Sequence, residues 1–343
     1  MSLGLRIKLS LMMFLQYFVW GTWLPMLGQQ IGPNGVNLDP REIGWVFTVY
    51  GFGAILGPFV IGQLADRYFA TEKLMAACHL VGGLILILTA YATGFWPIFA
   101  LLFLYCNLYM PTMGLSNSIT FRNLGEGHQD QFPSIRLWGT IGWIVAGLFF
   151  AFYLMVGNPP TPADGPLGFF EQIGEYLAGG ARSVAALPAV RSLFDYVGKP
   201  GFRDCLRVAG VFSILYGFYC FLLPHTPPVP AKETDPIDKK SAVLEALELM
   251  RFRSFAVLVV VAGLIVIMLA FYFACENFFL EDIGTDPKKV GAYMTIGQIA
   301  EVVVMVFVPM AVARLGVKNT MLLGAGMWAL RFALSTIGRP WWL

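Results

Sequence analysis

Hydrophobic positions along the chain form long continuous runs rather than alternating patterns. A helix that crosses the roughly 30 Å hydrocarbon core of a bilayer needs about 20 apolar residues. Nine runs have this length, and they cover residues 7–28, 43–65, 73–94, 96–121, 134–156, 206–224, 254–280, 290–313 and 318–338. Strands of a membrane barrel would alternate apolar and polar positions instead. The pattern therefore predicts an all-α polytopic membrane protein with about nine transmembrane helices.

Two segments between the runs do not have the composition of a membrane span. Segment 157–205 contains two short amphipathic pieces separated by Gly179 and Gly180. We expect it to lie on the outer membrane interface, or to be an insert without a role. Segment 225–252 carries mixed charges, which predicts a cytoplasmic linker with a helix over about 241–250. The expected units are a six-helix N-terminal bundle with the outer insert (1–224), the linker (225–252) and an incomplete C-terminal bundle (253–343).

An internal repeat supports this division. Residues 62–67 after the second run and residues 311–318 after the eighth run are both predicted to be tight basic loops that join two spans. If they correspond, the seventh run repeats the first. The second half then has counterparts for only three of the first six helices, so we expect the chain to be truncated at its C-terminus.

Composition narrows the class of protein further. The chain is 57% hydrophobic and 13% charged, whereas a soluble domain carries about 25% charged residues. A net charge of +2 without a basic block gives no case for nucleic-acid binding. The five cysteines are scattered, which predicts neither a disulfide framework nor a metal site. No catalytic or cofactor-binding motif occurs, so we expect neither an enzyme nor a cofactor.

Lysine and arginine in the short loops favour a cytoplasmic N-terminus, because cytoplasmic loops of membrane proteins are enriched in these residues. Arg6, Lys8, Arg67 and Lys73 then lie inside, whereas the short outer loops hold fewer basic residues. The long segment 157–205 carries further basic residues on the outside, but long loops follow this rule poorly.

Polar side chains inside the runs are candidates for function, because burying them in lipid is costly. Arg136, Thr140 and Trp143 share one face of the fifth run, where they offer a cation, a hydroxyl and an aromatic ring. Gln298 and Glu301 share one face of the eighth run, where they offer an amide and a titratable carboxyl. This combination suits a neutral ring compound that is rich in hydroxyl and amide groups.

Each of these charged residues also has a structural interpretation. Glu301 is expected to be functional, with an ion pair to Arg136 or Arg331 as the alternative. Arg136 lies near a helix end and could snorkel to the interface. Glu276 is equally consistent with an interfacial position, and Arg331 is more typical of helix packing. Hydrogen-bonded core or interhelical roles are predicted for His79, Gln16, Asn107 and Asn117, and close helix packing for Gly53, Gly57, Gly139 and Gly142.

Residues 62–67, with the pattern Gly-x-Leu-Ala-Asp-Arg, and the six-plus-six layout resemble the major facilitator superfamily. The resemblance narrows at five segments to the bacterial nucleoside–proton symporter family. These segments are residues 18–24, 109–115, 132–142, 298–301 and 330–334.

This resemblance implies a twelve-helix transporter of the bacterial inner membrane, a monomer that takes up nucleosides with protons by rocking its two halves. It implies substrate contacts at Arg136, Thr140, Trp143, Gln298 and Glu301, with Glu301 and Arg136 also involved in proton coupling. The conformational-switch loop would include Gly62, Asp66 and Arg67.

The chain departs from the family at two places. Ala270 and Phe273 stand where the family can present a glutamine and an asparagine to the substrate, and the acid of the tenth span is missing. These departures keep two alternatives open. One is a symporter of a sugar or another small polar solute on the same fold. The other is a non-transporting sensor or an inactive remnant.

Overall fold

The structure is a computed structural model of the whole chain, and it describes residues 2–125, 127–157, 169–197, 200–228, 248–287 and 290–337. Within these ranges some side chains also lie outside the description, including those of Asp66, Gln298 and Glu301. Most of the predicted linker, and with it most of the helix predicted over 241–250, lies outside the described residues.

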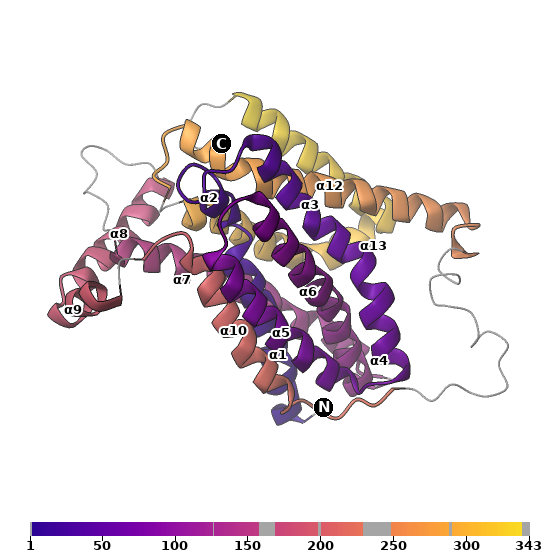
Figure 1. The fold of residues 1–343 in the computed structure, drawn as a ribbon. Helices are drawn as coiled ribbons and strands as arrows, with labels where there is room; N and C mark the ends of the chain where they lie inside the picture. The colour runs from indigo at the N-terminus through magenta and orange to yellow at the C-terminus, as the bar shows by residue number, and fades with distance from the viewer. Residues whose placement is uncertain are drawn as a thin grey trace.

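Helices make up most of the described chain, and this part contains no strand (Figure 1). The elements are α1 (Leu3–Trp23), α2 (Leu27–Ile31), α3 (Pro40–Gly57), the π-helix η1 (Pro58–Gly62), α4 (Gln63–Arg67), α5 (Thr71–Tyr91), α6 (Phe95–Leu124), the 3₁₀ helix η2 (Gln129–Gln131), α7 (Phe132–Gly157), α8 (Phe169–Ala185), α9 (Pro188–Val197), α10 (Asp204–Cys220), α12 (Arg253–Asp282) and α13 (Val290–Ile337). The predicted all-α fold class is therefore confirmed.

The predicted spans can be followed one by one in these helices. Among the residues that the structure describes, six helical stretches are long and apolar enough to cross a membrane: Leu3–Ile31, Pro40–Ala65, Thr71–Tyr91, Phe95–Leu124, Phe132–Gly157 and Arg253–Asp282. α10 coincides with the sixth predicted run but has only 17 residues. α13 contains both the eighth and the ninth predicted runs. The count of about nine spans is therefore approximate, and the chain is a multi-pass membrane protein.

The two loops of the predicted repeat are shorter than expected. Helix α4 continues through Arg67, so the chain leaves the helix only at residues 68–70. In α13 the predicted loop is reduced to a kink at Gly316, whose backbone angles are φ 76° and ψ 163°. A glycine adopts positive φ without a steric penalty, so one residue is enough to redirect the chain.

The helices that correspond to the first six predicted runs pack as three closely contacting pairs: α1 with α7, α5 with α10, and α3 with α6. Small residues bring the backbones together. A Cβ atom added to Gly83 of α5 would lie 2.6 Å from the carbonyl oxygen of Gly210 in α10. A Cβ atom added to Gly53 of α3 would lie 2.6 Å from the carbonyl oxygen of Cys106 in α6. The close packing predicted at Gly53 is confirmed.

A buried hydrogen-bond network joins four of these helices. The Gln16 side chain of α1 donates from Nε2 to Thr112 Oγ1 of α6 at 2.8 Å. Its Oε1 lies 3.1 Å from His79 Nε2 of α5. His79 Nδ1 in turn lies 3.1 Å from Ser213 Oγ of α10. The core role predicted for His79 and the interhelical role predicted for Gln16 are both confirmed.

The interhelical role predicted for Asn107 is wrong. Its Nδ2 donates to the carbonyl oxygen of Phe103, one turn back in the same helix, at 2.8 Å. Such a local bond satisfies a polar side chain without a second helix. For Asn117, Oδ1 is buried and has no hydrogen-bond partner in the described part of the chain.

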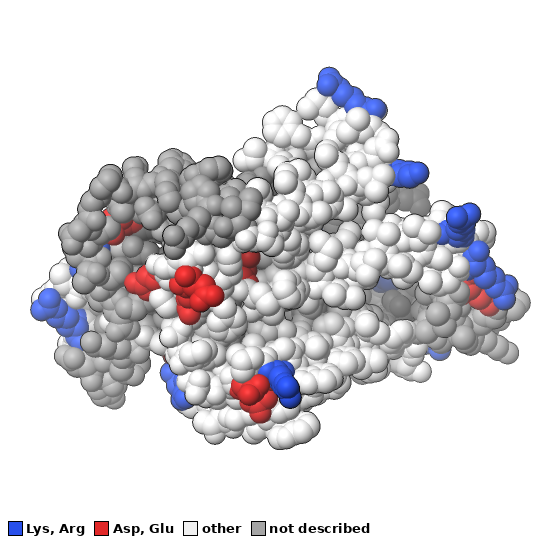
Figure 2. Space-filling model, turned by 90° about the horizontal axis from the view of Figure 1, so that it is seen from above, with Lys and Arg blue, Asp and Glu red and all other residues white. Residues whose placement is uncertain are grey.

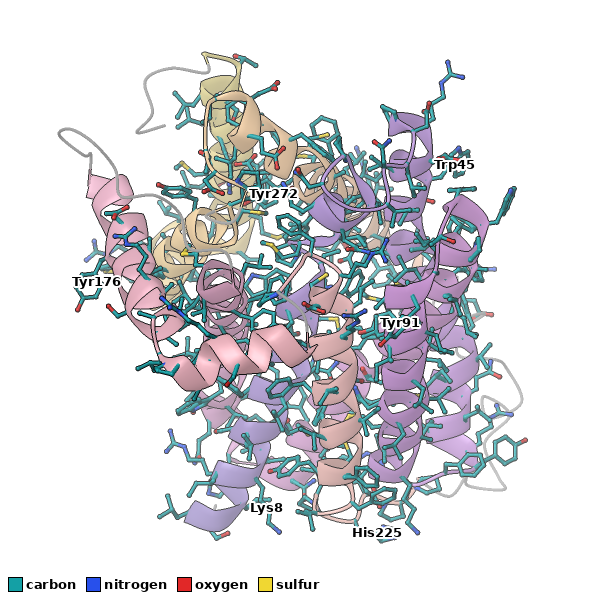
Figure 3. The ribbon with its side chains drawn as sticks, turned by 60° about the vertical axis from the view of Figure 1, so that its left-hand side comes forward. Lys8, Trp45, Tyr91, Tyr176, His225 and Tyr272 are labelled. Atoms are coloured by element: carbon teal, nitrogen blue, oxygen red, sulfur yellow. The ribbon has the colours of Figure 1, made fainter. Side chains whose placement is uncertain are left out.

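The first and last helices of this group meet at one end of the molecule. Tyr219 donates from its hydroxyl to the carbonyl oxygen of Lys8 at 3.0 Å, and Lys8 Nζ donates to the carbonyl oxygen of Leu222 at 3.1 Å. Lys8 and His225 lie at the same end in Figure 3. An even number of crossings therefore separates the start of α1 from the end of α10.

The second half contacts the first through α13 against α7 and through α12 against α3 and α2. Asn34, after α2, donates from Nδ2 to Glu281 Oε1 of α12 at 3.1 Å. A Cβ atom on Gly32 would lie 3.0 Å from the Phe278 ring. Figure 1 shows α2 at the end of the molecule opposite the N-terminus. These contacts close the two halves together at that end.

The division predicted at Gly179–Gly180 is wrong, because α8 runs through both glycines and ends at Ala185. The break falls instead just before Pro188, the first residue of α9. Proline lacks a backbone N–H and fixes φ, so it begins a helix more readily than it continues one. Helix α8 is held by a small apolar cluster with α7 that is separate from the main core. Its buried members are Ala151, Met155, Val156, Ala178 and Ala181.

The surface agrees with a membrane environment. Figure 2 shows a face that is mostly uncharged, with its acidic and basic side chains in small separate groups. Large apolar side chains are exposed on several helices, for example Trp45 on α3 and Phe271 on α12. Exposed apolar area of this extent is unusual on a soluble protein and is what lipid would cover.

Candidate functional site

The predicted residues of the fifth span lie on α7, beside α1. Thr140 and Trp143 are buried, each 8% exposed. Arg136 is half-buried, and its guanidinium carbon lies 4.0 Å from the centroid of the Tyr17 ring of α1. A cation over an aromatic face is a favourable arrangement that also fixes the guanidinium plane. Arg136 therefore has a defined place in the protein interior.

A glycine makes this arrangement possible. A Cβ atom on Gly139 would lie 2.7 Å from Arg136 Nη1 and 2.7 Å from Cδ2 of the Tyr17 ring. Real carbon contacts are not this short, so any larger residue would displace either the guanidinium or the ring. The close packing predicted at Gly139 is confirmed, and the structure adds that it serves a charged side chain.

Trp143 stands in a group of aromatic rings contributed by several helices. Its ring meets Trp20 of α1 edge-on, with 5.0 Å between centroids. Trp20 in turn stacks on Tyr50 of α3 at 5.8 Å. From the second half, Phe273 of α12 lies 5.6 Å from Trp143. We call Tyr17, Trp20, Tyr50, Trp143 and Phe273 the aromatic cluster.

Sequence reasoning missed three members of the aromatic cluster: Tyr17, Trp20 and Tyr50. Tyr17 and Trp20 are three residues apart in α1 and so face the same way. That spacing, in a run that also resembles the family, was the available signal. The sequence comparison marks Phe273 only as a residue without hydrogen-bonding groups, whereas its ring lies against Trp143 in the structure.

The eighth-span residues Gln298 and Glu301 belong to α13, which packs against α7. Their side chains lie outside the described part of the structure, as does that of Asp66 in the switch region. Gly62 ends the π-helix η1, and Arg67 ends α4. The site predictions for these residues therefore stay predictions.

A second charged group lies in the C-terminal half. Arg331 of α13 donates from Nη2 to Glu276 Oε1 of α12 at 3.3 Å. Its guanidinium carbon lies 4.1 Å from the centroid of the Tyr272 ring and 5.7 Å from that of Trp328. Tyr272 is buried at 3% exposure and lies among the helices in Figure 3. Arg331 is thus part of an ion pair between helices, in addition to the packing role predicted for it.

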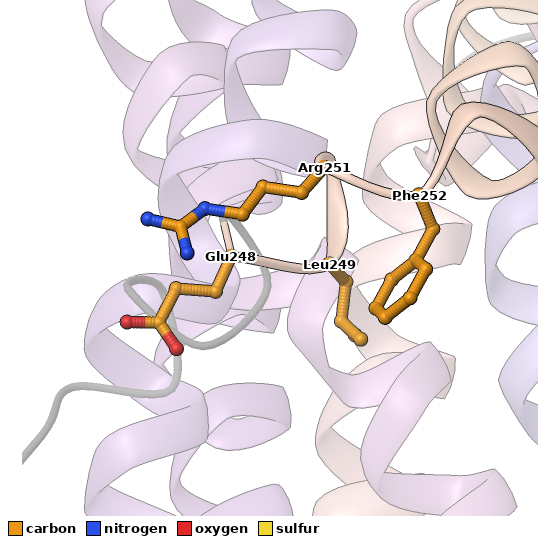
Figure 4. Close-up of a pocket in the computed structure, with 4 residues that line it drawn as sticks. All are labelled: Glu248, Leu249, Arg251 and Phe252. Carbon is orange, nitrogen blue, oxygen red and sulfur yellow. The ribbon is translucent and has the colours of Figure 1, made fainter.

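The structure also has a hollow of about 440 Å³ lined by Glu248, Leu249, Arg251 and Phe252 (Figure 4). It lies just before α12, about 20 residues from Phe273. Because an α-helix rises 1.5 Å per residue, this corresponds to roughly 30 Å along the helix. The hollow is therefore distinct from the aromatic cluster. The described residues contain no group of metal-ligating side chains.

The sequence profile of the family described as "Nucleoside H+ symporter" matches residues 3–159 and 183–340. The chain belongs to the nucleoside H+ symporter family. Residues 160–182, which include most of α8, lie between the two matched ranges. The predicted class of function, proton-coupled nucleoside transport, is confirmed at the level of this family.

Proteins similar to this chain are consistent with its place in the nucleoside H+ symporter family. The chain is 33% identical over 332 residues to the putative nucleoside transporter YegT of Escherichia coli (strain K12), covering 96% of this chain and 68% of that protein. It is 28% identical over 349 residues to the nucleoside permease NupG of the same organism, covering 98% and 72%. A crystal structure of the nucleoside transporter NupG matches with a TM-score of 0.68 at 25% identity, covering 97% of this chain and 74% of that one. The major facilitator fold is confirmed.

Proposed function

We propose that this protein imports nucleosides together with protons across the bacterial inner membrane, with its N-terminus in the cytoplasm. The observation that carries the proposal is the aromatic cluster with Arg136 beside it, built by both halves of the molecule. A nucleoside has a flat base and several hydroxyl groups. It therefore needs a stacking surface together with hydrogen-bond donors and acceptors, and the cluster and α7 supply both.

In this mechanism the base stacks on Trp143. Stacking on an aromatic side chain contributes about 1–3 kcal/mol per base and tolerates different bases. Arg136 and Thr140, on the same face of α7, hydrogen-bond the base or the ribose. The stack on Tyr17 fixes the orientation of the Arg136 guanidinium before binding, so this side chain loses less conformational freedom when a nucleoside binds.

The second half contributes Gln298 and Glu301 from α13. The Gln298 amide offers both a donor and an acceptor to the substrate. Glu301 carries the coupling proton, because a carboxyl binds a proton in apolar surroundings and releases it when a cation such as Arg136 approaches. Nucleoside and proton then cross together as the two halves rock about the site.

The contacts of Asn34 and Gly32 with α12 close the end opposite the N-terminus. With the N-terminus inside, this is the outer end, so we assign the structure to an inward-facing arrangement. Figure 1 shows α4 at the N-terminal end of the molecule. Gly62, Asp66 and Arg67 would there form the cytoplasmic switch that holds the alternate, outward-facing arrangement closed.

Uptake of labelled uridine tests the proposal, in cells that lack their own nucleoside importers. Uptake should collapse with a protonophore, with Glu301→Gln and with Arg136→Gln. The matched controls are Asp282→Asn at the exposed end of α12 and Arg191→Gln on exposed α9, and both should transport normally. Uptake that ignores the protonophore and Glu301→Gln would refute the proton role.

The same cells separate the alternatives. Phe273 has no hydrogen-bonding group where the family can present one, which keeps a different polar solute open as the cargo. Competition of labelled uridine by unlabelled nucleosides but not by sugars would exclude a sugar symporter. Nucleoside binding to the purified protein without uptake would instead indicate a sensor.

A further inference from the structure

Trp20 has a buried hydrogen-bond donor without an acceptor. Its side chain is 8% exposed and stands between Trp143 and Tyr50 in the aromatic cluster. No acceptor in the described part of the chain bonds its indole nitrogen Nε1. Buried donors are nearly always paired in native proteins, because an unpaired one loses its bond to water and gains nothing. An exception at this position calls for a partner that is not part of the protein.

Two of the polar side chains near Trp20, Tyr109 and Arg136, already have partners. Tyr109, whose ring centroid lies 6.5 Å from that of Trp20, donates from its hydroxyl to the Gln16 carbonyl oxygen at 2.5 Å. Arg136 lies on the ring of Tyr17. The buried donor of Trp20 has no such partner among the described residues, so it remains available to a ligand.

Exposed tryptophans of the same chain do not share this condition. Trp45 is 58% exposed and Trp96 is 73% exposed. An indole at the surface can find water or a lipid headgroup for its N–H, so its placement costs little. Trp23 of α1 is also buried and has an unpaired Nε1 among the described residues, but its ring packs on Tyr105, outside the aromatic cluster. Trp20 is thus the tryptophan that combines an unpaired donor with a place beside Trp143.

We propose that Trp20 donates a hydrogen bond from Nε1 to an oxygen atom of the bound nucleoside and so helps determine specificity. The proposal rests on the proposed function, because it places the nucleoside base on Trp143. An indole N–H is a donor only. It therefore favours an accepting oxygen, namely the base carbonyl that cytidine lacks or a ribose hydroxyl, over an amino group at the same position. Trp20 would reject a substrate that presents a donor there.

Trp20→Phe tests this inference, because it removes the N–H and keeps an aromatic ring. The matched control is Trp45→Phe on the exposed face of α3. Binding is measured on the purified full-length protein, by calorimetry, for uridine, cytidine, and the 2′-, 3′- and 5′-deoxy analogues of uridine. Cytidine replaces one base carbonyl by an amino group, and each deoxy analogue lacks one hydroxyl oxygen.

We expect Trp20→Phe to raise the Kd for uridine about 3- to 10-fold, the value of one neutral hydrogen bond. One analogue, the one without the accepting oxygen, should bind Trp20→Phe and the wild type equally well. The thermal stability of Trp20→Phe without nucleoside should fall only by the effect of the smaller ring, because the unliganded protein loses no hydrogen bond. Trp45→Phe should change neither quantity.

Three results would overturn the inference. The first is an unchanged Kd for uridine. The second is a rise by the same factor for every nucleoside, which indicates a general change of the site. The third is lower stability of unliganded Trp20→Phe together with uniform loss of binding, which indicates that a water or the fold uses the N–H. Nucleoside binding without protonophore-sensitive uptake would refute the proposed function and leave this inference standing.

Discussion

Gly139→Ala is the sharpest test of the site, because one methyl group should displace Arg136. The added Cβ atom would lie 2.7 Å from both Arg136 Nη1 and the Tyr17 ring. The guanidinium is the more easily moved of the two, because it is at the end of a long side chain, whereas Tyr17 is buried. Moving it forfeits the stack on Tyr17, which contributes about 0.5–2 kcal/mol. The KM for uridine uptake should therefore rise roughly 2- to 30-fold.

The assay measures initial rates of uridine uptake against concentration, normalised to the amount of protein in the membrane. Gly44→Ala is the control, because a Cβ atom there has nothing within 4 Å. Tyr17→Leu should raise KM similarly by removing the other member of the stack. Adding Gly139→Ala to Tyr17→Leu should then raise KM little further, because the two changes remove one shared interaction. A wild-type KM in Gly139→Ala, or full additivity of the two changes, would refute the reasoning.

Three further predictions concern the stability of the purified protein in detergent, measured by thermal unfolding. Glu276→Gln and Arg331→Met should each destabilise the protein, because each leaves a partly buried charge without its partner. The double variant should lose less stability than the sum of the two single losses, whereas additive losses would show that the two side chains do not interact. His79→Leu should lower the free energy of unfolding by about 2–3 kcal/mol, because Gln16 and Ser213 each lose a hydrogen-bond partner. An unchanged midpoint of thermal unfolding would contradict this network. Gly83→Ala should separate α5 from α10 and lower the free energy of unfolding by about 1–3 kcal/mol. Retention of wild-type stability would show that the two backbones do not touch.

The helices and part of the site follow from local sequence patterns. Run length predicts spans, because the thickness of the bilayer sets the number of apolar residues. Helical periodicity predicts that Arg136, Thr140 and Trp143 share a face. Periodicity does not say which other helix meets that face. Tyr17 and Tyr50 are therefore beyond this prediction, since Tyr17 meets Arg136 of α7, and Tyr50 meets Trp20 of α1, only after the helices pack.

The incorrect predictions concern where helices break. The composition at Gly179 and Gly180 predicts a boundary, but a glycine lowers helix stability by only about 1 kcal/mol, and packing against α7 exceeds that. Pro188 is the true boundary, because it cannot continue the preceding hydrogen-bond ladder. At Gly316 the prediction is wrong in the other direction, because a loop of several residues is predicted where the helix is interrupted only by a single glycine with positive φ.

Helix α8 is a suitable site for fusing a second protein to this one. It lies largely outside the stretch that the family profile matches, and it is attached to α7 by its own apolar cluster. Met155 in that cluster is 12 residues from Trp143, or roughly 18 Å along the helix axis. Transporters of this size show few landmarks for aligning particle images in electron cryo-microscopy. A rigid helical protein fused in frame with α8 would provide such a landmark without disturbing the nucleoside site.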